Sequence, residues 1–166
     1  MSNAIATQTI ELRKVKISDF ASRETTCFEA EVWVDGKRIG WVGNDGRGGM
    51  HEADTAVYEI VGEYAKTLPE RPWGFTEGTY QPCFETVIDD LLTHHIRQKD
   101  VKSLMRKTAK YVLYYKDGDF WTCKAGSKGL DATLAYVRER LGDTVVIIND
   151  MTAKDAEAFI HQKLSH

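Results

Sequence analysis

The segment from Gly43 to Met50 carries the most specific chemical signal in the sequence, because four of its eight residues are glycines. Consecutive backbone N–H groups in such a loop can converge on an anion, and Arg47 adds a positive charge beside them. The segment lacks the Gly-Lys-Ser/Thr ending of a P-loop, and its spacing differs from the dinucleotide-binding fingerprint. We interpret it either as a loop that binds a ligand or partner or as a flexible connector. Its candidate binding residues are Asn44, Asp45, Gly46, Arg47, Gly48, Gly49 and His51.

His51, Glu52 and Asp54 follow this loop at the start of an expected helix. A histidine beside two carboxylates could act as a general base or bind a metal ion. The alternative is that Glu52 or Asp54 caps the helix while His51 is exposed to solvent. A single histidine favours this second interpretation.

Asp89, Asp90, His94 and His95 form a second titratable cluster. Asp90 and His94 are four residues apart and share a helical face, as a pair of metal ligands would. No third ligand follows at a recognisable spacing, and His95 aligns with the apolar stripe of the same helix. No Ser-His-Asp or Cys-His signature is present either. We therefore predict no metal site, no cofactor and no catalytic residue.

The three cysteines Cys27, Cys83 and Cys123 are odd in number and far apart in the sequence. This pattern fits neither a disulfide framework nor a zinc site. We expect free and mostly buried thiols.

Six basic residues lie between Arg97 and Lys110, with one acidic residue among them. At helical spacing they could follow the phosphates of a nucleic acid or an acidic protein surface, or they could form an ordinary solvated face. The formal net charge of -3 makes nucleic-acid binding through bulk charge the weaker expectation. The candidate nucleic-acid residues are Lys99, Lys102, Arg106 and Lys107.

Two tryptophans are candidate partner contacts. Trp33 is expected on the polar face of its strand, and Trp73 lies in a proline-rich segment. Exposed tryptophans are enriched at interfaces, although they can also cover a sheet from outside.

The elements that must position these residues follow from periodicity. Alternating apolar residues and turn signals predict strands near residues 10–17, 28–34, 37–42, 111–116, 120–124 and 144–148. Asp-Gly pairs at 35–36 and 117–118 predict tight hairpin turns, and a loss of phase predicts a bulge near Arg13 and Lys14. Apolar residues at helical spacing predict four to five helices, with the stretch from 84 to 109 forming one bent helix or two.

This order of elements predicts an α+β fold of antiparallel hairpins packed with helices. We expect the strand near 144–148 to be buried on both faces and to run parallel to a strand of the second hairpin, through a right-handed crossover.

A chain of 166 residues with 42% hydrophobic residues is long enough for one domain. The sequence also admits two lobes, a βββα lobe at 10–68 and an ααββαβα lobe at 84–166, joined by a proline-rich connector at 69–83. No apolar run approaches the roughly 20 residues of a membrane span, and the first residues lack a secretory signal. We therefore expect a cytoplasmic protein without a membrane partner.

Three stretches carry a resemblance: the residues from Cys27 to Lys37, the run from Asn44 to Gly49, and Leu91-Leu92 ahead of the lysine-rich helix. Together they resemble small uncharacterised bacterial proteins of phages and other mobile elements. The resemblance implies no particular activity. It implies a protein that acts by binding, including inhibitors that block a host defence protein.

The leading hypothesis is a non-enzymatic cytoplasmic protein that binds another protein through the glycine-rich loop and exposed aromatics. A nucleotide- or phosphate-ligand-binding protein or hydrolase that uses Gly43 to Gly49 is the first alternative. The second alternative is an accessory protein that binds nucleic acid through the basic helix at 97–110.

Overall fold

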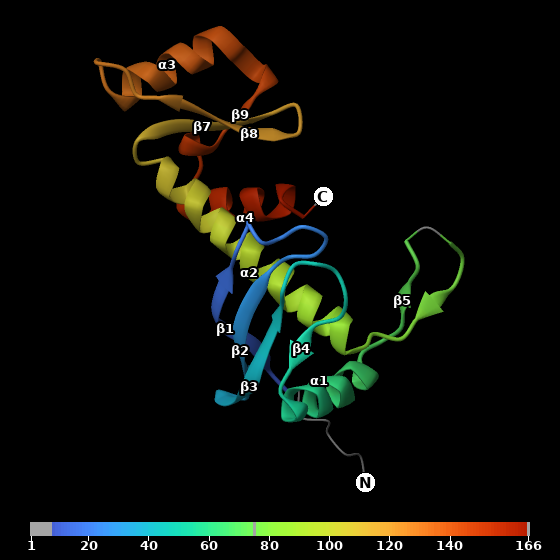
Figure 1. Cartoon of the computed structure of the whole chain (residues 1–166). Helices are drawn as coiled ribbons and strands as arrows, with labels where there is room; N and C mark the ends of the chain where they lie inside the picture. The colour runs from blue at the N-terminus through green and yellow to red at the C-terminus, as the bar shows by residue number, and fades with distance from the viewer. Residues whose placement is uncertain (1–7, 75, 166) are drawn as a thin grey trace. The chain divides into compact units, whose positions relative to one another are not determined.

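A computed structural model describes residues 8–74 and 76–165 of the chain. The fold is α+β, as the order of elements predicted, and the chain divides into two compact units, Met1–Thr93 and His94–His166 (Figure 1). We call these unit 1 and unit 2. The boundary between them lies inside the long helix α2 (Phe84–Lys107), whereas the proline-rich connector lies within unit 1.

An antiparallel sheet of four strands forms the centre of unit 1. The strands are β1 (Ile10–Ile17), β2 (Phe28–Val34), β3 (Lys37–Asn44) and β4 (Glu52–Ala53), in the order β1-β2-β3-β4. Asp35 and Gly36 have φ values of 47° and 79°, so the predicted tight turn between β2 and β3 is confirmed. The predicted bulge is confirmed as well, because the β1–β2 register shifts between Arg13 and Lys16.

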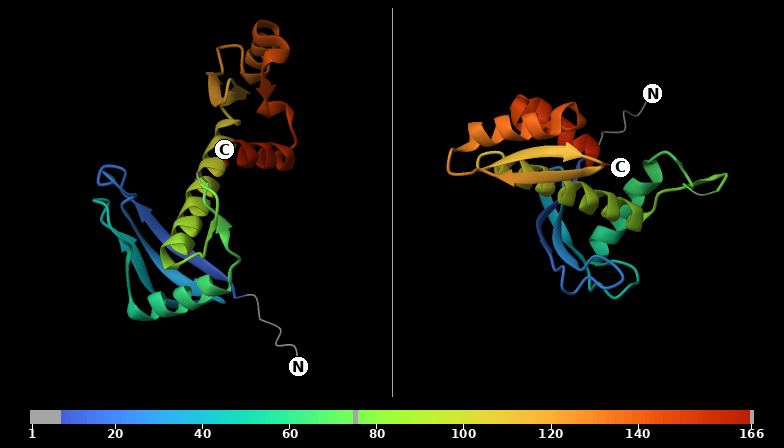
Figure 2. Two further views of the ribbon diagram at one scale, coloured as in Figure 1. Left: turned by 90° about the vertical axis from the view of Figure 1, so that its right-hand side faces the viewer. Right: turned by 90° about the horizontal axis from the view of Figure 1, so that it is seen from above.

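One face of this sheet builds the core of unit 1. Helix α1 (Thr55–Thr67) and the first turns of α2 supply the apolar side chains that cover it (Figure 2). A Cβ at Gly40 would lie 2.7 Å from Val57 Cγ2, so this glycine allows α1 to approach β3 closely. The buried apolar residues of these elements are Ile10, Phe28, Ala30, Val32, Val34 and Val42 on the sheet and Val57, Val61, Ala65, Phe84, Val87, Ile88 and Leu92 on the helices.

The proline-rich segment forms a short hairpin of β5 (Arg71–Pro72) and β6 (Thr79–Tyr80). The Trp73 amide donates to the Gly78 carbonyl at 3.1 Å, and Arg71 pairs with Asp90 of α2 at 2.6 Å. Asp90 thus serves as an ion-pair partner for the hairpin. The stretch after it is a single helix, which settles the two alternatives for residues 84–109.

Unit 2 contains a second sheet with strand order β8-β7-β9. Its elements are β7 (Tyr111–Lys116), β8 (Asp119–Lys124), α3 (Leu130–Leu141), the 3₁₀ turn Gly142–Thr144, β9 (Val146–Ile147), the 3₁₀ turn Ile148–Asp150 and α4 (Ala153–Lys163). Helices α3 and α4 each have a defined end, because Gly142 ends α3 at φ 55° and the Thr152 hydroxyl accepts the Asp155 amide at the start of α4.

The prediction for the last strand was wrong in direction and length. β9 pairs antiparallel with β7, and Val146 is 38% exposed rather than buried. The turn at Gly142 reverses the chain after α3. Beyond the two residues of β9, the Asn149 side chain takes the place of further strand hydrogen bonds to β7. Its Oδ1 accepts the Leu113 amide at 2.7 Å, while its Nδ2 donates to the carbonyls of Thr108 and Tyr111.

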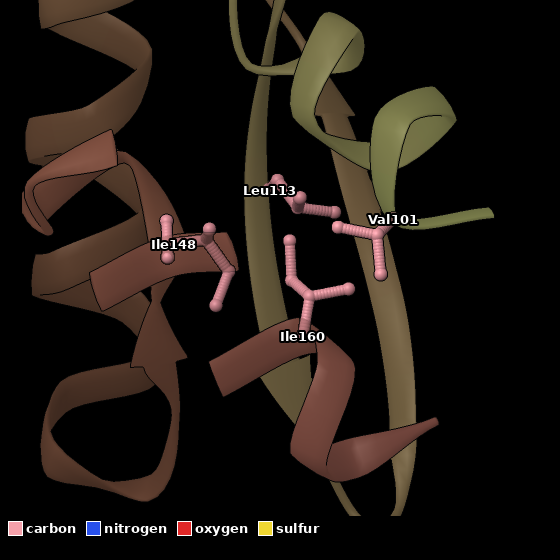
Figure 3. Close-up of a cluster of buried hydrophobic side chains, with 5 residues drawn as sticks. Val101, Leu113, Ile148 and Ile160 are labelled. Atoms are coloured by element: carbon pink, nitrogen blue, oxygen red, sulfur yellow. The ribbon is translucent and has the colours of Figure 1, made fainter. Parts of the chain in front are cut away.

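Apolar side chains from four segments meet in the core of unit 2. Figure 3 shows four side chains pointing toward one another: Val101 of α2, Leu113 of β7, Ile148 of the 3₁₀ turn that follows β9, and Ile160 of α4. All four are at most 8% exposed. Their burial holds the hairpin, the 3₁₀ turn and α4 together without a disulfide, since all three cysteines of the chain are free.

Candidate functional site

The glycine-rich loop joins β3 to β4 and packs against the loop of residues 18–27 between β1 and β2. Both loops lie at the same end of the unit 1 sheet (Figure 1). The Gly46 carbonyl accepts the amides of Arg23 at 2.9 Å and Glu24 at 3.0 Å. A Cβ at Gly46 would overlap the carbonyl oxygen of Ala21, and the residue has a φ of 81°. Glycine is therefore required at 46 for the two loops to pack.

The Asn44 side chain holds the loop from inside. It is 6% exposed, and its Oδ1 accepts the Thr25 hydroxyl at 2.6 Å and the Gly46 amide at 2.9 Å. Because Oδ1 accepts a backbone amide, the Nδ2 group must face the other way. Nδ2 lies 3.3 Å from the Gly49 carbonyl and 3.3 Å from His51 Nδ1. One side chain thus fixes both ends of the loop.

Three consecutive amides of this loop are bonded to side-chain oxygens of the chain itself. Besides the Gly46 amide on Asn44, the Arg47 amide donates to Asp45 Oδ1 at 3.0 Å and the Gly48 amide to Thr25 Oγ1 at 3.3 Å. An anion-binding loop would direct such amides toward the ligand. The side chains of Asp45 and Arg47 are exposed.

His51 is buried, so the expectation of an exposed histidine was wrong. The residue is 7% exposed, its ring packs edge-on against Phe28 at 5.3 Å, and its Nε2 lies 3.0 Å from Asp89 Oδ1. Both Glu85 oxygens accept the His51 amide, at 3.1 and 3.2 Å. These carboxylates come from α2, more than thirty residues later, which is why local spacing gave no sign of them.

The ring of His51 has a defined tautomer in this network. Asn44 Nδ2 donates to Nδ1, so the ring proton is on Nε2 and is donated to Asp89. The Tyr58 hydroxyl also donates to the His51 carbonyl. Since both ring nitrogens are engaged and the ring is buried, His51 is suited to joining the loop to α2 rather than to receiving a substrate proton.

The other half of the expected capping arrangement is also different. Asp54 is the N-cap residue of α1, but its side chain makes no cap hydrogen bond. Its Oδ2 instead accepts the Trp41 amide of β3 at 2.9 Å. Among the residues that the structure describes, no group of three or more His, Cys, Asp or Glu side chains is arranged to hold a metal ion.

The two candidate tryptophans lie away from the loop. Trp33 is beside the turn at the opposite end of the β2–β3 hairpin, with Arg13 stacked 4.2 Å from its ring and its Nε1 donating to Glu31. Hydrogen bonds from Lys14 and then from Trp33 lower the pKa of Glu31 below its ordinary value. Trp73 packs on Tyr80 in the β5–β6 hairpin, with ring centroids 4.6 Å apart.

Sequence reasoning missed the most exposed apolar side chains beside the loop. Phe20, in the loop of residues 18–27, is 96% exposed, and Met50 is 74% exposed. The signal for Phe20 was available, because it is a single aromatic residue within the polar run Ser18 to Thr26. The partners of the loop, Thr25 and Glu85, carried no local signal.

The basic residues Lys99, Lys102, Arg106 and Lys107 lie on the unit 2 part of α2, where all four are exposed. Lys102 lines a hollow of about 470 Å³ between α2 and α4, together with Gln98, Lys154, Glu157 and His161. Lys102 and Lys154 share this hollow with the acidic Glu157, so its charge is mixed.

The expectation of mostly buried thiols was wrong, because Cys27 and Cys123 are half-buried and Cys83 is exposed. Cys83 precedes α2, and hydrogen bonds from the Thr86 side chain and then the Thr86 backbone lower the pKa of its thiol.

Comparisons with known proteins found no relative: no family model, curated protein or solved structure matches the chain. In the described part of the chain, no helix has both the length and the apolar character to cross a membrane. The class that the structure defines is an α+β protein of two units.

Proposed function

We propose that the chain is a protein-binding protein, and that its contact surface is the pair of packed loops in unit 1. We call this surface the loop pair, residues 18–27 and 45–51. The observation that carries the proposal is the exposure of Phe20, 96% in a loop that hydrogen bonds hold in place. A fully exposed phenylalanine on an ordered loop is typical of an interface anchor.

The order of the loop pair supports this role. Ser22 Oγ accepts the Cys27 amide at 2.8 Å, so the loop that carries Phe20 is closed by its own side chain. The Gly46 carbonyl and the Thr25 hydroxyl tie it to the neighbouring loop. A surface that is ordered before binding loses less conformational entropy on association.

The charges around Phe20 and Met50 favour a protein over a polyanion. The loop pair carries exposed charges of both signs, namely Asp19, Arg23, Glu24, Asp45 and Arg47. Apolar anchors within a mixed polar rim are the usual composition of a protein interface. A phosphate-rich partner would instead be matched by an excess of Lys and Arg.

The nucleotide-binding alternative receives less support from the same loop, because the amides of Gly46, Arg47 and Gly48 already have acceptors within the chain. A cytoplasmic host defence protein is the partner that the phage-type resemblance predicts.

The test replaces Phe20 with the photo-cross-linker benzoylphenylalanine in cells that make the protein. The control places the same residue at Lys37, beside the β2–β3 turn at the opposite end of the unit 1 sheet from the loop pair. The cross-linked protein is then purified for titration. Since Phe20 buries almost nothing in the free chain, Phe20→Ser should leave the free energy of unfolding within about 0.5 kcal/mol. It should weaken binding by about 10- to 100-fold, because burying a phenylalanine contributes about 1.5–3 kcal/mol.

Two results would contradict the proposal. One is a cross-link that forms equally well from position 37. The other is a purified partner that binds the Phe20→Ser variant as tightly as the wild-type protein.

A further inference from the structure

Two long strands, β1 and β8, lie at the edges of their sheets, and their free edges differ in regularity and charge. β1 has 8 residues, a register shift between Arg13 and Lys16, and Lys14 at φ 52°. Its exposed side chains are charged, and two of them pair across the sheet with Glu29 and Glu31. Bulges and charges of this kind prevent another strand from pairing with an edge.

β8 has no bulge, and its charged residues, Asp119 and Lys124, lie only at its two ends. Its 6 residues keep an unbroken antiparallel register with β7, and in the described part of the chain it pairs with β7 alone. Its middle residues, Trp121, Thr122 and Cys123, are uncharged. An edge without a bulge and with an uncharged middle is a template for a further strand.

The hairpin geometry shows which backbone groups this edge offers. Asp117 and Gly118 form the two-residue turn with φ values of 51° and 92°, so Lys116 and Asp119 are the hydrogen-bonded pair next to it. In an antiparallel ladder every second residue then directs its N–H and C=O away from the partner strand. In β8 these residues are Phe120, Thr122 and Lys124.

A hollow of about 330 Å³ lies at the end of this edge, between β8, the turn after it and α3. Tyr136 of α3, 57% exposed, forms part of its wall beside Cys123 and Thr133. Two lysines, Lys124 and Lys128, also line the hollow, and none of the described lining residues is acidic. A strand added to β8 would carry every second side chain on the α3 side of the sheet, toward this hollow.

We propose that the free edge of β8 binds an extended acidic peptide segment of a partner protein, which adds a strand to the unit 2 sheet. The backbone of the peptide pairs with Phe120, Thr122 and Lys124. An apolar side chain that faces the hollow packs against Tyr136, and carboxylates two residues away on the same face of the peptide pair with Lys124 and Lys128. This site belongs to unit 2 and does not depend on the loop pair of unit 1.

The test uses a blocked peptide of the repeat Glu-Ser-Val-Ser as the probe, because this repeat places glutamate and valine alternately on one face of a strand. The matching peptide with lysine in place of glutamate is the charge control. Binding to the full chain is followed by NMR. The glutamate peptide should slow hydrogen exchange of the Phe120, Thr122 and Lys124 amides, while the Trp121 and Cys123 amides are protected already. The lysine peptide should bind at least about tenfold more weakly.

Thr122→Pro removes one outward N–H group without removing a bond to β7, and proline is tolerated at an edge. This substitution should weaken binding of the glutamate peptide by about tenfold. Thr122→Val keeps the N–H group and should leave binding unchanged. The two-strand register of both variants is checked from their β7 amide shifts. Failure of the glutamate peptide to bind, equal binding of the two peptides, or protection at residues outside β8 would overturn the proposal.

Discussion

Removal of the Asn44 side chain tests the loop architecture most sharply. Asn44→Ala leaves two buried groups without a partner, the Gly46 amide and His51 Nδ1, while the half-buried Thr25 hydroxyl can turn to water. Each buried polar group that loses its partner costs about 1–3 kcal/mol. We therefore expect the free energy of unfolding of unit 1 to fall by about 2–6 kcal/mol.

Urea unfolding of the full chain gives the loss of stability, and hydrogen exchange locates it. The Gly46 amide should lose its protection in Asn44→Ala. Asn44→Asp keeps the acceptor for the Gly46 amide but turns a buried carboxylate oxygen toward the Gly49 carbonyl and His51 Nδ1, so it should also destabilise unit 1 while the Gly46 amide keeps its hydrogen bond.

Asn149→Ala is the matched control. This side chain is likewise bonded to its surroundings, through three hydrogen bonds that all lie in unit 2. Its removal should destabilise unit 2 and leave the Gly46 amide protected. If Asn44→Ala lowers stability by less than about 1 kcal/mol, or if Gly46 stays protected in it, the assignment of Asn44 as the centre of the loop is refuted.

Three further predictions follow from single residues. Gly46→Ala should lower the melting temperature by more than Gly49→Ala, because a Cβ at 46 overlaps Ala21 whereas the space around Gly49 is open, as a thermal melt of each variant would show. Cys83 should react with iodoacetamide before the other thiols, since it is exposed with a lowered pKa, and Thr86→Val should slow its alkylation as followed by mass spectrometry. His95 should titrate by NMR below its ordinary pKa of 6.5, because burial and then Lys99 and Lys102 disfavour the charged ring. The unfolded chain then binds the proton more tightly than the folded chain does. The contribution of His95 to stability is therefore complete above pH 6.5 and falls as the pH drops through its lowered pKa. Lys102→Ala should raise the pKa of His95, because it removes one of the nearby positive charges.

Most of the fold was predictable because its signals are local. The Asp-Gly turns at 35–36 and 117–118 require positive φ at both central residues, and strands that flank such turns pair with each other. The bulge in β1 was predictable as well, because the loss of alternation that signals it lies within the strand itself.

The predicted direction of β9 was wrong because the pairing of this strand depends on contacts that are distant in the sequence. Asn149 binds the backbone of β7, 36 residues earlier, and no pattern near 144–148 reports that contact. A short apolar run such as Val145 to Ile148 fits a parallel and an antiparallel strand equally well.

The candidate site shows the same division. The glycine-rich loop was identified from its composition, but its role depends on long-range partners. His51 was expected to be exposed because its neighbours in the sequence are polar, yet α2 brings Glu85 and Asp89 onto it. Exposure of Phe20 depends equally on where its loop packs, so a single phenylalanine in a polar run gave only a weak signal.

The central claim is that the loop pair is held in one shape by its internal hydrogen bonds, ready to present Phe20. NMR relaxation order parameters of the backbone amides from Ala21 to Thr25 and from Gly46 to Gly48 test it most directly. We expect values of about 0.85, those of rigid backbone, in the free protein. Values below about 0.6 in both loops would show that the surface is mobile before binding and would contradict the account.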